Sequence, residues 1–131
     1  MVQKELEIIL ARAWASTLAM PIFIVDPQGT LLYYNEPAER ILGHRYEDTG
    51  EMTAEVWSKV FQPADRTGTP LPPNSLPLVI ALSERRPAHR DFWIRGMDSV
   101  PHHIEVTAFP MTGQAGRYLG AMALFWEVDE G

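Results

Sequence analysis

The chain contains no cysteine among its 131 residues. Without thiols it can form no disulfide, no thiolate zinc or iron–sulfur site and no cysteine nucleophile. It also lacks the run of roughly 18 apolar residues that a membrane-spanning helix needs. The first twenty residues carry early acidic side chains where a secretory signal would have an unbroken apolar stretch. We therefore expect a cytoplasmic protein.

Positive charge is also scarce. The chain has 17 Asp and Glu residues against 11 Lys and Arg, for a formal net charge of -6. Such a field repels phosphate backbones and anionic lipid surfaces, so we expect neither nucleic acid nor a membrane as a partner. The small basic cluster of Arg85, Arg86 and Arg90 is typical of an ordinary solvated surface. With 46% hydrophobic and 21% charged residues, the composition predicts one globular domain.

An amphipathic helix is predicted from Lys4 to Met20. Its apolar residues recur at steps of three and four, which places them on one face of a helix. Pro21 ends the helix, because the residue before a proline avoids helical backbone angles. The apolar face consists of Leu6, Ile9, Leu10, Ala13, Trp14 and Leu18.

A hairpin and a capped helix follow. Residues 22–25 and 31–34 are rich in β-branched and aromatic side chains, and the turn sequence Asp26-Pro27-Gln28-Gly29 joins them. Asn35 can accept hydrogen bonds from the free amides of a short helix. Gly43 then provides a left-handed stop.

The rest of the chain predicts two helices and three strands. The helices span 53–61 and 74–86, and the strands span 88–95, 102–110 and 118–128. Short turns make the strands antiparallel neighbours.

The last strand is apolar at nearly every position, so both faces of the sheet must be covered. The middle helices can cover one face, and the N-terminal helix has the apolar stripe to cover the other. We expect a second copy of the chain to bury the apolar surface left over. The predicted dimer residues are Leu6, Ile9, Leu10, Ala13, Trp14 and Trp126.

The order of elements and the first hairpin resemble the PAS domain family. The family's turn, strand, helix cap and glycine stop are matched, at the family's spacing, by Asp26, Gly29, Leu31, Asn35, Ala38 and Gly43. The resemblance covers nearly all of residues 20–128. It implies an α+β fold with a five-stranded antiparallel sheet and short helices on one face, to which we add the N-terminal amphipathic helix on the other. We therefore divide the chain into a helix that dimerises or caps, residues 1–20, and a PAS domain, residues 21–131.

The resemblance also implies a function, which is to sense or to relay a signal through dimer contacts without catalysis. Flavin sensors and yellow photoreceptors of this family use a cysteine, which is absent here. The family's haem sensors carry a histidine on the helix equivalent to 75–86, which has none; His44 or His89 would have to replace it. We predict no cofactor. The family's usual ending of Asp, an apolar residue and Thr is replaced by Glu127-Val128-Asp129, so coupling to an attached kinase or cyclase is not implied.

An internal pocket is the remaining candidate site. Inward-facing apolar side chains either fill the core or leave room for a small, largely apolar ligand. The candidate polar contacts are groups such as Asn35, His89 or Thr107. The candidate pocket residues are Asn35, Trp57, Phe61, Leu78, His89, Phe92, Ile94, Ile104 and Met122.

Two further hypotheses concern histidines. His102 and His103 are adjacent on a strand and point to opposite faces, so we predict no metal site. If His103 pairs with Glu105, two residues along on the same face, we expect a surface or interface contact. A cofactor-independent enzyme would need His89 or His103 beside Asp91 or Glu105 in a closed pocket. Phosphate loops and nucleophile elbows are absent from the sequence. We therefore predict a non-catalytic module that forms a homodimer, meets a signalling partner and accepts a small ligand or none; the alternatives are an enzyme of this kind or a haem sensor.

Overall fold

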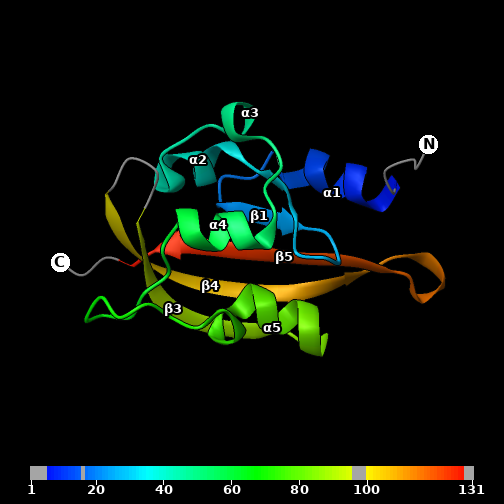
Figure 1. Ribbon diagram of the computed structural model, residues 1–131. Helices are drawn as coiled ribbons and strands as arrows, with labels where there is room; N and C mark the ends of the chain where they lie inside the picture. Colours follow the sequence, from blue (N-terminus) through cyan, green and yellow to red (C-terminus); the bar gives the residue numbers. More distant parts are fainter. Residues whose placement is uncertain (1–5, 16, 96–99, 129–131) are drawn as a thin grey trace.

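A computed structural model describes residues 6–15, 17–95 and 100–128 of the chain. Its five strands form one sheet in the order β2-β1-β5-β4-β3, and each neighbouring pair is antiparallel (Figure 1). The strands are β1 (Ile22–Val25), β2 (Leu31–Tyr34), β3 (Ala88–Arg95), β4 (Pro101–Thr112) and β5 (Tyr118–Glu127). The predicted five-stranded antiparallel sheet is confirmed.

The described helices are short. They are α1 (Leu6–Ala15), α2 (Glu36–Leu42), α3 (Tyr46–Thr49), α4 (Ala54–Val60) and α5 (Pro77–Glu84), with 3-10 turns at Pro73–Ser75 and Gln114–Gly116. Helix α3 is not among the predicted elements, and the predicted helix 74–86 is divided into the first 3-10 turn and α5. Among the described residues, no helix has the length and apolar character that crossing a membrane requires.

Two apolar clusters pack against the two faces of the sheet. The inner cluster joins β-strand residues such as Phe23 and Val106 to side chains of α2, α4 and α5, so the predicted placement of short helices on one face is confirmed. The outer cluster contains Ile22, Ile24 and Met122, and Ala11 of α1 packs against it. In Figure 1, α1 lies toward the end of the sheet where β4 and β5 are joined. The sheet is therefore a two-sided layer, with most of the helices on its inner side.

Asn35 ties the first hairpin to the helix that follows it. The side chain is fully buried, and its Oδ1 accepts hydrogen bonds from the backbone N–H of Ala38 at 3.2 Å and of Ile22 at 3.0 Å. Its Nδ2 donates to the carbonyl of Met20 at 2.9 Å. The predicted cap of α2 is confirmed, and Gly43 ends this helix at a φ of +80° as expected. One side chain thus connects α2, β1 and the chain before β1.

The turn of the first hairpin occurs a second time. Residues 26–30 read D-P-Q-G-T, and residues 65–69 read D-R-T-G-T. In both, the aspartate Oδ1 accepts from the backbone N–H of the third and fifth residues, at 2.9 and 2.9 Å in the first turn and 2.9 and 3.0 Å in the second. The glycines have φ values of +86° and +87°. The second turn belongs to a small hairpin in which Ala64 pairs with Pro70 and with Trp93, so it extends the sheet beyond β3.

Candidate functional site

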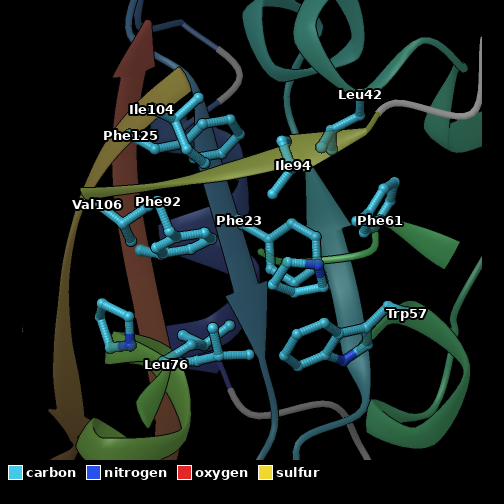
Figure 2. A pocket seen from close by; sticks show the side chains of 14 residues that line it. Phe23, Leu42, Trp57, Phe61, Leu76, Phe92, Ile94, Ile104, Val106 and Phe125 are labelled. Carbon is cyan, nitrogen blue, oxygen red and sulfur yellow. The ribbon is translucent and has the colours of Figure 1, made fainter. Parts of the chain in front are cut away.

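An apolar cavity of about 70 Å³ lies between the inner face of the sheet and α4 and α5. Figure 2 shows aromatic rings of Phe23, Trp57, Phe61 and Phe92 directed toward this space. None of the fourteen lining residues has a titratable side chain. The one polar side-chain atom among them, Trp57 Nε1, donates to the carbonyl of Gly29 at 2.8 Å. The cavity therefore offers shape and apolar contact and no group for proton transfer.

The walls of the cavity are held by ring contacts. The ring of Phe23 meets Trp57 edge to face at 5.4 Å and Phe61 at 6.3 Å, and it stacks on Tyr34 at 6.1 Å. Such pairs add to the stability that burial provides. The hydroxyl of Tyr34 donates to the carbonyl of His44 at 2.9 Å, and burial raises the pKa of this tyrosine. The cavity is thus formed by side chains with fixed neighbours.

Most of the predicted pocket residues line this cavity. They face inward from α4 and the residue after it, and from α5, β3 and β4. They are Trp57, Phe61, Leu78, Phe92, Ile94 and Ile104.

Three predicted pocket residues do not line it. Asn35 uses its side chain to hold backbone groups, as described above. Met122 belongs to the outer cluster, because its neighbours Ala121 and Ala123 occupy the inward positions of β5. His89 lies on the outer face of β3, since it is three residues from the inward-facing Phe92. Met122 and His89 therefore lie on the outer face of the sheet, and their predicted place in the pocket is wrong.

The outer face of β3, β4 and β5 carries three rows of paired residues. In the first row, Trp93 lies beside His103. In the second row, Asp91 lies beside Glu105, which lies beside Trp126. In the third row, His89 lies beside Thr107, which lies beside Leu124. Asp91 and Glu105 are thus direct cross-strand neighbours of like charge, an arrangement that is unfavourable by itself.

Each of these two acids contacts a histidine of the neighbouring strand that lies in the next row of the sheet. His103 Nε2 lies 2.9 Å from Asp91 Oδ2, and His89 Nε2 lies 3.1 Å from Glu105 Oε1. The hydrogen bond from His103 lowers the pKa of Asp91. The register across to β3 brings Asp91 next to the ring of His103. Both pairs lie on the sheet surface, outside the cavity.

The other histidines also lie away from the cavity lining. His102 Nδ1 contacts Glu127 Oε2 at 2.6 Å, and the exposed His44 lies 3.8 Å from Asp48. Within the described part of the chain, no three His, Cys, Asp or Glu side chains come together in a way that could hold a metal ion.

The predicted dimer residues of α1 are exposed. Ile9, Leu10 and Trp14 have 46%, 58% and 52% of their surface accessible, and Ala13 is exposed as well. Trp126 on β5 is half-buried, near the ring of His89. Leu6 lies outside the residues whose side chains the structure describes. The apolar stripe of α1 is therefore exposed to solvent in a single copy of the chain.

Comparison with known proteins gives consistent results. A family model described as "PAS domain" matches residues 19–128. The fold is similar to the PAS domain of BvgS from Bordetella pertussis, with a TM-score of 0.63 at 16% identity over 95% of this chain and 87% of that one. It is similar to the PAS domain of nitrogen regulation protein NR(II) from Vibrio parahaemolyticus, with a TM-score of 0.63 at 21% identity over 91% and 98%. A LOV protein from Rhodobacter sphaeroides gives a TM-score of 0.73 at 16% identity over 96% and 70%. The search of curated proteins finds no match.

Proposed function

This chain belongs to the PAS domain family, and on that premise we propose that it is a non-catalytic sensory or signalling module that works as a homodimer. The main support for a dimer is the position of the exposed large apolar side chains. Of the six in the described residues, four lie between residues 9 and 20: Ile9, Leu10, Trp14 and Met20. Such a concentration marks an interaction surface, because each side chain gains free energy when it leaves water.

The rest of the outer face extends this surface. Phe109, Leu124 and Trp126 are only partly buried on the side of the sheet that α1 shares. A homodimer usually forms about a two-fold axis, which buries the same patch on both copies. A second copy of this chain would cover the exposed stripe of α1 and the apolar part of the sheet together.

Replacing Leu10 by glutamate tests this proposal. We expect the parent chain to be a dimer in sedimentation equilibrium and Leu10→Glu to raise its dimer Kd by about thirtyfold, the effect of losing a 2 kcal/mol hot spot. The matched control is Val56→Glu, an exposed apolar residue on α4. We expect this variant to dimerise like the parent. A parent chain that stays monomeric, or a Leu10→Glu variant that dimerises as tightly as the parent, would contradict the proposed dimer.

The lack of catalysis is supported by where the acids and bases lie. An enzyme of the kind considered above needs a histidine and a carboxylate in a closed pocket. Here the lining of the cavity is wholly non-titratable, and the histidine–carboxylate pairs lie on the outer face. The haem alternative has little support for the same reason, since none of the four histidines lines the cavity.

Binding of a small apolar ligand is the second candidate function, and the cavity favours it. At about 70 Å³ the cavity is smaller than an engineered core cavity of about 150 Å³ that accepts benzene, so a ligand of few atoms fits without rearrangement. The lining offers such a molecule apolar contact alone.

A valine at position 123 tests the ligand, because Ala123 lines the cavity and two added methyl groups reduce its space. We expect an apolar probe smaller than benzene, such as xenon, to raise the melting temperature of the parent and to leave that of Ala123→Val unchanged. Met122→Leu, on the opposite face, should keep the response. A colourless parent with only its polypeptide mass in native mass spectrometry, and with no shift from the probe, would argue against a ligand.

A further inference from the structure

The outer face of β3 and β4 concentrates titratable groups in one small area. His89 and Asp91 come from β3, and His103 and Glu105 come from β4. We call these four residues the histidine–carboxylate quartet. It lies beside Trp126 and Trp93, on the part of the sheet farther from the β4–β5 turn.

Both histidines of the quartet are placed so that they can gain a proton without losing a contact. His89 Nδ1 lies 2.6 Å from Thr107 Oγ1, and a hydroxyl can either donate to this nitrogen or accept from it. The ring of His103 stacks on Trp93 with centroids 4.9 Å apart and planes at 9°. An aromatic face of this kind attracts a cation. Proton uptake therefore fits the existing geometry of the face.

The charge of the quartet changes strongly with protonation. With neutral histidines the two carboxylates give it a charge of -2, and with protonated histidines the charge is zero. Asp91 stays ionised throughout, because its pKa is lowered by the bond from His103. Histidine changes charge between about pH 5 and 8, whereas carboxylates normally titrate below this range.

Within β3, β4 and β5, few other charged groups lie near the quartet. In β3, β4 and β5, one cationic side chain, Arg95, shares the face of the quartet, and it lies one row beyond the pair of Trp93 and His103. An arginine keeps its charge at mildly acidic and at neutral pH, so it does not contribute to the change of charge. Arg90, His102 and Glu127 belong to the opposite face of the sheet. The neighbouring β5 positions on this face, Leu124 and Trp126, are uncharged.

We propose that the quartet makes the homodimer sensitive to protons, so that two copies associate through their outer sheet faces more tightly at mildly acidic pH than at neutral pH. The inference rests on the proposed homodimer. Two outer faces brought together about a two-fold axis would place four carboxylates in one partly desolvated layer. With neutral histidines this layer is repulsive, and like charges across an interface are costly. With protonated histidines each face is neutral, and the exposed His89 of one copy can meet the carboxylates of the other.

Sedimentation equilibrium between pH 5.5 and 7.5, at constant ionic strength, tests the inference. We expect the dimer Kd of the parent to fall about tenfold or more from pH 7.5 to pH 5.5, since up to four histidines per dimer take up protons. At pH 7.5 added NaCl should also tighten the dimer, because salt screens the repulsion between the carboxylates.

Two double variants should change the dimer Kd at pH 7.5 and its dependence on pH in different ways. His89→Gln with His103→Gln keeps hydrogen-bonding side chains but no titration, so we expect a weak dimer with a flat pH profile. Asp91→Asn with Glu105→Gln removes the repulsion, so we expect a tighter dimer at pH 7.5 than the parent forms. His44→Gln, which removes an exposed histidine away from the sheet, is the control and should retain the pH dependence of the parent.

The outcomes separate the inference from the proposed function. A dimer whose Kd is unchanged between pH 5.5 and 7.5, or whose pH dependence survives in the double glutamine variant, overturns the inference and leaves the dimer in place. A chain that is monomeric at every pH overturns both. Sensitivity lost with the quartet histidines and kept in His44→Gln establishes the inference.

Discussion

Replacing Gly120 with alanine is expected to remove at least about 3 kcal/mol of folding free energy, a large part of the total for a small domain. Gly120 lies in β5 with a φ of +124°, and a Cβ built on it would be 2.0 Å from the carbonyl oxygen of Val25. That oxygen cannot easily move, because Val25 pairs with Ala121 on one side and with Leu31 on the other. The alanine would therefore be both strained and blocked by backbone.

Gly116→Ala separates these two effects. Gly116 has a φ of +71°, but nothing lies within 4 Å of a Cβ added there. We expect it to cost only about 1 kcal/mol, the penalty of a left-handed backbone. Urea denaturation at matched protein concentration measures both variants, and circular dichroism reports whether Gly120→Ala folds. Equal losses for the two variants would show that the close approach of β1 to Gly120 does not restrict this position.

The sequence predicts this fold well where a structure depends on a few neighbouring residues. The turn at residues 26–29, the cap at Asn35 and the stop at Gly43 are all of this kind, and all three are found. Strand β3 is found at the predicted residues, Ala88–Arg95, because Pro87 before it and the turn sequence from Gly96 after it limit the segment. The second turn, at residues 65–69, carries the same five-residue signal as the first. Comparing the two segments would have revealed it.

Faces of the sheet are harder to predict than its strands. Strand β5 has apolar residues on both of its faces. Its sequence therefore does not show that Met122 faces outward while Ala121 and Ala123 face inward. The inward side is clear where polar and apolar residues alternate, as at Ile104 between His103 and Glu105, and Ile104 does line the cavity. The pairing of His103 with Asp91 depends on the register between β3 and β4, which depends in turn on residues far apart in the chain. Local pattern therefore predicts elements, and packing decides which side chains meet.

Asn35→Ala should be about as damaging as the change at Gly120, with an expected loss of about 3 kcal/mol. The side chain is fully buried, and its removal leaves the N–H groups of Ile22 and Ala38 and the carbonyl of Met20 without these partners. Each unsatisfied buried group costs about 1–3 kcal/mol. Chemical denaturation with a fluorescence readout from the tryptophans measures the loss.

Thr53→Ala is the matched control, because Thr53 also caps a helix. Its side chain is exposed and accepts only a long bond of 3.4 Å from the N–H of Val56. We expect a loss of about 1 kcal/mol or less, the usual value for a cap. Asn35→Ser should recover only part of the Asn35→Ala loss, since a serine hydroxyl can cap α2 but is too short to serve β1 and Met20 as well. If serine restored the full stability, or if both alanine variants lost the same amount, Asn35 would be an ordinary helix cap and not the connection between α2 and the sheet.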